Sequence, residues 1–282
     1  MPASLNCTGW RSVIDPARVA FWKSDNLSKT KSDLFDRIGA RVTAAGGKMV
    51  RGDVAQLAEY ADQGLLPIAG CEPKLTQLIA DWRTRNVPWG YWDRGYFRRI
   101  YACADFNRAQ SGSGFYRWHI NSFQTQRLLD VPDDRWKALR LPVAEWQKGG
   151  RHIVIAAPSR TYTRFHRTES WIADTIDALA RVTARRLEIR DKEHVRNRSL
   201  QEDLKGAHCL VTHGSIAAVE AVVLGCPVFV DPSSAAAVVG CTDLKQIEKP
   251  CYPDRQPWLN SLAYSQWDEI ELTNGALWKM LS

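Results

Sequence analysis

One short run of the sequence combines the residue types and the spacing of an anion-binding turn. The run HCLVTHGSIAAVEAVVLGCPVFVD covers residues 208–231 and places His213, Gly214 and Ser215 between an apolar segment and a segment of small residues. Gly214 allows the backbone a tight turn off a strand end, and Ser215 is a good N-cap for the helix that follows. The first amides of such a helix have no intrahelical partner, so they could bind the oxygens of a diphosphate.

Two side chains of this run could contact the same ligand. His213 could add a hydrogen bond or a positive charge to a phosphate group. Glu220 lies in a helix that is otherwise Ile, Ala and Val, and a buried carboxylate there needs a partner such as the hydroxyls of a ribose. The alternatives are ordinary capping by His213 and Ser215 and a simple exposed position for Glu220. Together, at this spacing, the residues favour a nucleotide site.

Polar and basic residues also follow two other predicted strands. Arg190 and Lys192 come after the strand 186–189, and Ser159 and Arg160 come after the strand 152–156. Two cations at the strand ends would offset the charge of a diphosphate. The alternatives are a solvated charge run around Arg190 and Lys192, where acidic residues are interspersed, and a plain loop at Ser159 and Arg160.

The second half of the chain has the strand and helix rhythm that would bring these residues together. Strands are predicted over 152–156, 186–189, 208–212 and 227–230, and helices over 168–182, 199–205 and 215–224. This alternation predicts an α/β fold with a parallel sheet and helices on both faces. Ligands of such sheets bind outside the carboxyl ends of the strands, where the residues above should meet.

The first half has the same rhythm with less clear signals, and it too predicts a parallel sheet with helices on both faces. Strands are predicted over 18–22, 48–51, 65–69 and 87–92, and helices over the polar stretch to about residue 45, over 53–62 and from Pro73 onward. Residues 94–150 lose this regularity, and Gly149-Gly150 ends the segment. Two domains are therefore predicted, residues 1–150 and residues 151–282. The tail 268–281 is expected to form an amphipathic helix that crosses back onto the first domain or serves a dimer.

The run VTHGSIAAVEAVVLGCPVFV resembles the donor-binding segment of GT-B glycosyltransferases, especially capsule-type sugar transferases and glycosyltransferase-like proteins of bacteriophage genomes. The resemblance covers about residues 150–232 well and the first half in outline. It implies two Rossmann-like doubly wound domains facing each other across a cleft, with a nucleotide sugar, a UDP-sugar favoured, on the C-terminal domain and the acceptor on the N-terminal domain. Ser215 matches the start of the phosphate-binding helix, and Glu220 matches the acid that contacts the ribose. The long Gly-rich loops of larger GT-B enzymes are missing.

A transferase of this type needs a base that takes the proton of the acceptor hydroxyl. Asp93 is the first candidate, because it directly follows the predicted strand 87–92 and lies in WGYWDRGYFRR, which resembles a recurring segment of the phage proteins. His119 is the second candidate. The alternatives are that Asp93 caps a turn or pairs with Arg94, and that His119 is structural. Because cations and helix amides could stabilise the departing diphosphate, neither a metal nor another cofactor is expected, and the reaction would be inverting.

The acceptor is suggested by charge and aromatic content. Residues 1–150 hold 22 Lys and Arg against 15 Asp and Glu, whereas residues 151–282 hold 16 of each. Arginines interleaved with aromatic residues suit phosphate backbones and stacked bases. The resemblance to phage proteins then implies DNA as acceptor, with a hydroxymethylated pyrimidine that leaves its stack. The residues expected to bind the acceptor are Arg94, Tyr96, Arg98, Arg99, Arg117 and Trp118.

Two other functions fit the same residues. One is a sugar transferase of anionic surface polysaccharide synthesis, and the other is a catalytically silent GT-B relative that binds nucleic acid or a protein partner. Salt-sensitive affinity for DNA would favour a nucleic-acid partner. A dinucleotide oxidoreductase is less favoured because no GxGxxG opens either half.

The composition of 45% hydrophobic and 24% charged residues is that of a globular protein. No apolar run approaches a membrane span, and the N-terminus has no secretory signal pattern. The seven scattered cysteines and six histidines show no metal-ligand spacing. Reduced thiols are therefore expected, as in a protein of the cytoplasm. If the chain is phage-encoded, this is the cytoplasm of the host. The oligomeric state stays open.

Overall fold

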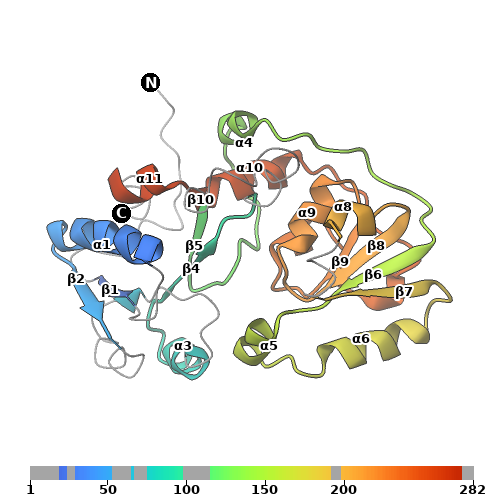
Figure 1. The fold of residues 1–282 in the computed structure, drawn as a ribbon, viewed down its shortest axis with the longest axis horizontal. Helices are drawn as coiled ribbons and strands as arrows, with labels where there is room; N and C mark the ends of the chain where they lie inside the picture. Colours follow the sequence, from blue (N-terminus) through green and yellow to red (C-terminus); the bar gives the residue numbers. More distant parts are fainter. Residues whose placement is uncertain are drawn as a thin grey trace. The chain divides into compact units, whose positions relative to one another are not determined.

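The computed structural model describes residues 19–23, 29–52, 65–66, 75–97, 115–191 and 198–274. The described residues form two compact units, with 19–97, 115–123 and 265–274 in the first and 124–264 in the second (Figure 1). The elements of the first unit are β1 (Ala20–Lys23), α1 (Lys29–Ala44), β2 (Lys48–Arg51), β3 (Leu65–Leu66), α3 (Leu75–Thr84), β4 (Gly90–Arg94), β5 (Tyr116–Ile120), β10 (Gln266–Trp267) and α11 (Glu269–Asn274). Those of the second unit are α4 (Asp134–Leu139), β6 (His152–Ala156), α5 (Arg160–His166), α6 (Trp171–Ala180), β7 (Arg186–Arg190), α8 (Leu200–Asp203), β8 (Ala207–Thr212), α9 (Ala217–Val223), β9 (Val228–Val230), the 3₁₀ helices η4 (Ala235–Val238) and η5 (Leu244–Gln246), and α10 (Gln256–Tyr264).

The first unit begins with a short parallel sheet in the order β2-β1-β3. All four residues of the central strand β1 are buried, as expected for a strand of a parallel sheet that is covered on both faces. The helix α1 buries Leu34, Ile38 and Val42, which recur every four residues along one face. The strands predicted at 18–22 and 48–51 and the helix between them are thus confirmed over their described residues.

The fourth predicted strand of this half does not continue the parallel sheet. Instead β4 pairs antiparallel with β5, which pairs antiparallel with β10, so the prediction that all strands of the first half form one parallel sheet is wrong. The physical reason lies in the alternation of β5, whose Tyr116 and Trp118 face one side of the sheet while Arg117 and His119 face the other. Trp118 stacks on Phe21, with ring centroids 6.2 Å apart, in the core beneath α1.

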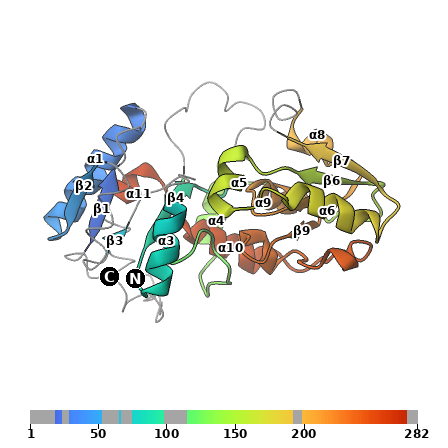
Figure 2. The same cartoon turned by 90° about the horizontal axis from the view of Figure 1, so that it is seen from below.

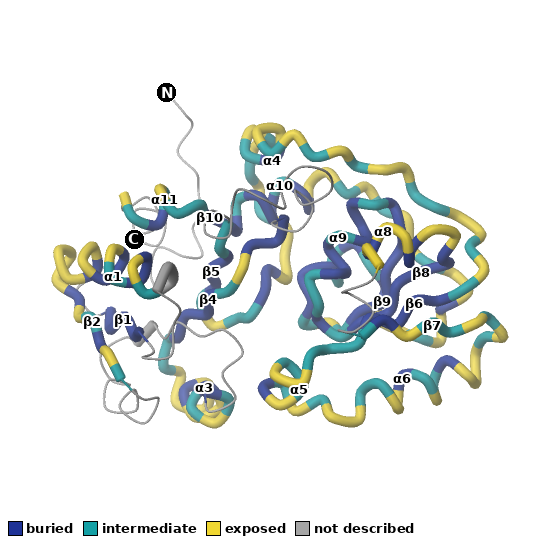
Figure 3. The backbone as a smooth tube through the Cα atoms, in the orientation of Figure 1, coloured by how far each residue is buried: buried dark blue, intermediate teal, exposed yellow. Residues whose placement is uncertain are grey.

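The second unit is built on a four-stranded parallel sheet in the order β7-β6-β8-β9, which confirms the predicted parallel sheet of the second half. Ile153, Ile155 and Val211 face α6 and η5, while α9 lies against the other face of β8 and β9 (Figures 1 and 2). The strands β6, β8 and β9 are almost wholly buried (Figure 3). All four strands run in the same direction, so their carboxyl ends share one edge.

The segment before the predicted domain boundary at Gly149-Gly150 packs within the second unit. The backbone N–H of Ala144 donates to the carbonyl of Val223 at 2.9 Å, and that of Gln147 donates to the carbonyl of Gly225 at 2.7 Å. Among the described residues, the second unit starts at residue 124, before Gly149-Gly150.

Beyond residue 264 the chain belongs to the first unit. Helix α11 packs on α1, where the guanidinium of Arg41 donates to the carbonyl of Thr273 at 2.8 Å and Arg37 lies 3.4 Å from the carboxylate of Glu269. The described part of the predicted tail helix ends at Asn274, and residues 275–281 lie outside the described residues.

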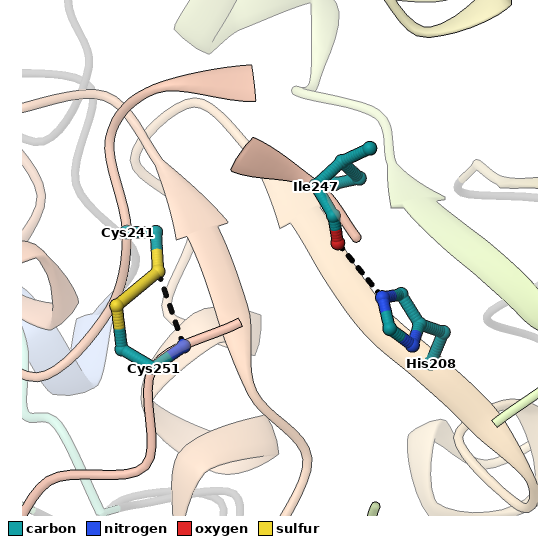
Figure 4. The surroundings of a disulfide bond; sticks show 4 residues. All are labelled: His208, Cys241, Ile247 and Cys251. Atoms are coloured by element: carbon teal, nitrogen blue, oxygen red, sulfur yellow. Dashed lines mark hydrogen bonds between the residues drawn. A yellow bond between two sulfur atoms is a disulfide. The ribbon is translucent and has the colours of Figure 1, made fainter. Parts of the chain in front are cut away.

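Two of the cysteines form a disulfide, Cys241 with Cys251, ten residues apart in sequence (Figure 4). The expectation of reduced thiols is therefore wrong for this pair. Cys209 and Cys226 are buried free thiols, and burial raises the pKa of Cys226 to about 12, so it remains protonated. Nearby, the ring Nε2 of His208 lies 2.7 Å from the carbonyl oxygen of Ile247, which ties the chain after η5 to β8.

Among the described residues, no helix has both the length and the apolar character that crossing a membrane requires.

Candidate functional site

The carboxyl ends of three neighbouring strands of the second unit each lead into a polar residue. Ser159 follows β6, His213 follows β8 and Asp231 follows β9. The strand ends are tied to one another, because the hydroxyl of Thr212 donates to the carbonyl of Ala156 at 2.8 Å and the N–H of Asp231 donates to the carbonyl of His213 at 3.1 Å. The sheet therefore brings Ser159, His213 and Asp231 to one edge, as the parallel topology predicts.

The imidazole of His213 is the central group of this edge. Its Nδ1 lies 3.0 Å from the hydroxyl oxygen of Tyr162, and its Nε2 lies 3.7 Å from a carboxylate oxygen of Asp231. The rings of His166 and Trp171 stand 6.3 and 6.0 Å from it, centroid to centroid. Burial lowers the pKa of His213, and the charge of Asp231 acts in the opposite direction. His213 is thus a half-buried imidazole with a polar neighbour at each ring nitrogen.

The helix α5 holds the tyrosine that contacts His213. Ser159 caps this helix, since its hydroxyl accepts a hydrogen bond from the N–H of Tyr162 at 3.1 Å. Arg160 is the first helical residue and is exposed. The predicted strand-end residue Ser159 therefore places Tyr162, a residue that the sequence did not single out.

The turn after β8 has a tighter fit than the sequence predicts. A Cβ atom at Gly214 would stand 2.3 Å from the hydroxyl oxygen of Tyr162, so any larger residue here would displace that hydroxyl. The hydroxyl of Ser215 accepts a hydrogen bond from the N–H of Ala217 at 3.2 Å within the turn before α9. The N-cap of α9 is Ile216, without a side-chain hydrogen bond, so the prediction that Ser215 caps this helix is wrong by one residue. Gly214 and Ser215 thus lie at the same edge as His213.

A buried glutamine braces this turn from a distant part of the sequence. The amide nitrogen of Gln124 donates to the carbonyl of Gly214 at 2.7 Å, and its amide oxygen accepts from the N–H of Ala235 at 2.8 Å. Gln124 therefore links the turn after β8 to the turn after β9. No pattern in the sequence signals this residue, whereas Asp231 could have been found by the rule that located His213, because it directly follows a predicted strand.

The other predicted donor-binding residues are placed differently. Glu220 is half-buried, one turn into α9. Arg190 ends β7, but its guanidinium is buried and forms an ion pair with Asp203 of α8, and it also donates to the carbonyl of Arg198 at 3.2 Å. The structure therefore turns Arg190 toward α8, and Lys192 lies outside the described residues.

In the first unit, Asp93 lies within the antiparallel ladder, opposite Arg117. One oxygen of its carboxylate accepts hydrogen bonds from the guanidinium of Arg117 at 2.8 Å and from the hydroxyl of Tyr91 at 3.3 Å. The other oxygen accepts from the N–H of Arg94 at 2.7 Å. The side chain of Asp93 is 31% exposed, whereas that of Arg117 is 6% exposed. Asp93 is thus an oriented carboxylate that solvent can reach, although it does not end a parallel strand as predicted.

The remaining predicted residues of the first unit lie at different depths. His119 is buried, and its Nε2 lies 2.8 Å from the hydroxyl oxygen of the buried Tyr96. Trp118 is part of the aromatic core, and Arg94 is exposed. Arg98 and Arg99 lie outside the described residues. The structure therefore groups Asp93 with Arg117, and it places His119 with Tyr96 in the interior.

The burial of His119 predicts a pH dependence of stability. Burial, and to a smaller extent the charge of Arg117, lower its pKa from 6.5 to about 3. Between these values the unfolded chain binds a proton that the folded chain does not, so the free energy of unfolding falls as the pH is lowered from 6.5 toward 3. We expect His119 to contribute about 1 kcal/mol per pH unit in this range. Denaturant unfolding at pH 6 and pH 5 measures the slope, which should be smaller in His119→Gln; equal slopes in the two proteins would contradict the expectation.

The comparisons with known proteins bear on the fold. The chain matches no protein-family model. A search of curated proteins finds no match. Among solved structures, the chain is similar to KpsC from Thermosulfurimonas dismutans, described as a beta Kdo 2,7 transferase, with a TM-score of 0.51 and 10% identity over 91% of this chain and 98% of that chain. A KpsC structure described as a beta Kdo 2,4 transferase matches with a TM-score of 0.44 and 10% identity over 86% and 89%. At 10% identity, the first match establishes a common α/β fold.

Proposed function

We propose that the protein is a glycosyltransferase that moves a sugar from a nucleotide-activated donor to a hydroxyl group of an acceptor. The observation that carries the proposal is the meeting of Ser159, His213, Ser215 and Asp231 at the carboxyl edge of the second sheet, where ligands of parallel sheets bind. The similarity of the fold to that of a Kdo transferase supports the same function. From this similarity and the position of the site, we infer a glycosyltransferase of the GT-B type.

The donor would bind through its phosphate groups and its ribose. We propose that His213 and the backbone amides near Ser215 donate hydrogen bonds to the phosphate oxygens, and that Glu220 binds a ribose hydroxyl. Arg160 at the start of α5 is exposed and could add a positive charge, while the charge of Arg190 is balanced by Asp203. No metal ion is required in this scheme.

In the transfer step, the bond between the anomeric carbon and the phosphate oxygen breaks while the acceptor oxygen bonds to the anomeric carbon. The electron pair of the broken bond leaves with the nucleotide phosphate, and the acceptor hydroxyl gives its proton to a base. We propose Asp93 as this base, because its carboxylate is oriented by Arg117 and by the N–H of Arg94 while remaining accessible. Attack by the acceptor opposite the departing phosphate inverts the anomeric configuration.

For the acceptor, we propose a hydroxyl of an anionic glycan. The excess of Lys and Arg over Asp and Glu in residues 1–150 favours a polyanion, and the KpsC structure is that of a protein that transfers Kdo. A hydroxymethylated pyrimidine in DNA was predicted from the same charge together with aromatic residues. Two of those residues, Tyr96 and Trp118, are buried in the first unit, so the structural support for stacked bases is weaker.

The test offers UDP-, GDP- and CMP-linked sugars, Kdo among them, to the full-length protein together with anionic oligosaccharides or hydroxymethylpyrimidine DNA. Mass spectrometry of each acceptor should reveal an added sugar on an oligosaccharide and none on DNA. A product on DNA alone would overturn the proposed acceptor and retain the transferase. If no donor is consumed while a known transferase works in the same mixtures, the proposed function is wrong, and salt-sensitive DNA binding would then indicate a silent binding protein.

A further inference from the structure

The two ring nitrogens of His213 have neighbours of different hydrogen-bonding capacity. We infer that Tyr162 and Asp231 are positioning residues that hold the neutral His213 imidazole in one tautomer, with its proton on Nε2. This inference adds detail to the proposed function. Only the effect of the tautomer on catalysis rests on that function. The tautomer itself is a property of the folded protein with no ligand.

The neighbours of the ring distinguish the two neutral tautomers. The hydroxyl of Tyr162 can donate or accept a hydrogen bond at Nδ1, so it is compatible with either tautomer. An ionised Asp231 can only accept, and its oxygen lies 3.7 Å from Nε2. A proton on Nδ1 would turn the lone pair of Nε2 toward a carboxylate, which is repulsive. A proton on Nε2 gives each group a complementary neighbour, because Tyr162 then donates to Nδ1.

The charged form of the ring is the third possibility. The titratable groups that face His213 are Tyr162 and His166 of α5 and Asp231 after β9, while Trp171 of α6 contributes an uncharged ring. Asp231 favours the imidazolium, but its side chain is 35% exposed and its charge is screened by solvent. Burial lowers the pKa of His213, which keeps the ring neutral near pH 7.

The position of the Tyr162 hydroxyl is itself fixed by the fold. Ser159 caps α5 through the N–H of Tyr162, and the ring of His166 stands 4.0 Å from the ring of Tyr162, centroid to centroid. On the other side, a Cβ atom at Gly214 would stand 2.3 Å from the Tyr162 oxygen. A Cβ atom at Gly214 would therefore displace the Tyr162 hydroxyl and disturb the same hydrogen bond that Tyr162→Phe removes.

The tautomer matters for the proposed transfer because of what each nitrogen can offer a phosphate group. An N–H at Nε2 can donate a hydrogen bond to a phosphate oxygen, whereas a bare Nε2 would present its lone pair to that anion. Loss of the hydrogen bond from Tyr162 removes the partner of Nδ1 and should let the ring rotate, so that its Nε2–H is no longer directed at the phosphate group. We expect Tyr162→Phe to lower kcat by about tenfold, the equivalent of about one hydrogen bond, with little change of KM.

The experiment reads the tautomer directly by nuclear magnetic resonance of the full-length protein with ¹⁵N-labelled histidine. Two-bond correlations distinguish protonated from bare ring nitrogens, and comparison with His213→Gln identifies the signal among the six histidines. At pH 7.5 we expect protonated Nε2 and bare Nδ1 in the natural sequence. Mixed signals are expected in Asp231→Asn, because the amide that replaces the carboxylate can accept from a protonated Nε2 or donate to a bare Nε2. In Tyr162→Phe and in Gly214→Ala the Nδ1 signal should shift, because the hydrogen bond from the phenol is lost or displaced. Tyr252→Phe is the matched control, since it removes a phenol hydroxyl from a ring that packs on Trp146, in a different part of the same unit.

The outcomes separate this inference from the proposed function. A proton on Nδ1, or an imidazolium, in the natural sequence overturns the inference, and so does an unchanged signal in Asp231→Asn. If the Nε2–H tautomer is present and is mixed with the other tautomer in Asp231→Asn, the positioning role stands even where no donor sugar is turned over. In that case only the proposed function fails.

Discussion

Replacing Asp93 by asparagine is expected to lower the rate of sugar transfer by about 10²- to 10⁴-fold, the usual contribution of a general base. Asparagine has nearly the same shape and can still accept the hydrogen bond from the N–H of Arg94, so the backbone of β4 should keep its path. What it loses is the negative charge that accepts a proton from the acceptor hydroxyl. The measurement is kcat/KM with the best donor and acceptor pair.

The same substitution should also lower the free energy of unfolding. Arg117 is 6% exposed and would keep its positive charge without the carboxylate that balances it. Because almost a third of the Asp93 side chain is exposed, we expect a loss of about 1–2 kcal/mol by denaturant unfolding. Activity is therefore compared at a temperature where the variant is folded. Asp81→Asn is the matched control, since Asp81 forms an exposed ion pair with Arg85 in the same unit. Transfer at the natural rate by Asp93→Asn would remove Asp93 from the mechanism.

The second sheet could be predicted because its strands carry their own signal. The inner strands β6 and β8 are continuous apolar runs, and the sequence between them has the spacing of helices. The strand β5 has no such signal, because arginine and histidine alternate with aromatic residues along it. Its pairing with β4 and β10 depends on partners far away in the sequence. Because charged and aromatic residues alternate along β5, the sequence did not predict this strand, whose antiparallel pairing changes the topology of the first half.

The candidate site was predictable to the extent that strand ends define it. That rule located Ser159 and His213, and it applies equally to Asp231. Tyr162 and Gln124 could not be found in this way. The helix α5 has only seven residues and no clear apolar periodicity, and Gln124 lies 90 residues before the carbonyl that it contacts. Residues that position a site, as opposed to forming its strand ends, are chosen by tertiary packing.

The partners of the predicted cations also depend on tertiary packing, which the sequence does not show. Arg190 ends a strand, as predicted, yet its guanidinium turns toward Asp203, which lies 13 residues later on α8. Arg117 was expected to face an acceptor, and it pairs with Asp93. The sequence identifies which residues carry charge, but the partner of each charge depends on which carboxylate the fold brings near.

Replacing His213 by alanine is expected to lower kcat/KM for transfer by about 10²- to 10³-fold, the effect of removing one hydrogen-bond donor from the charge that develops in a transition state. The ring has a hydrogen-bonding neighbour at Nδ1 and a carboxylate near Nε2, so its N–H is directed and needs little reorganisation when the phosphate departs. The cavity left by alanine stays between Tyr162 and Asp231, and water in it would donate a weaker and less oriented hydrogen bond.

The control for this prediction uses the same sheet. His152 begins β6 at the amino edge, and its Nε2 lies 3.1 Å from the carbonyl oxygen of Asp203, so His152→Ala removes an imidazole of similar burial from the opposite end of the strands. Both variants should lose stability, and His213→Ala alone should lose transfer. Because an N–H donor acts on the departing phosphate, the loss should be larger for donors whose nucleotide leaves less readily. An equal loss in the two variants would mean that His213 supports the fold and not the reaction.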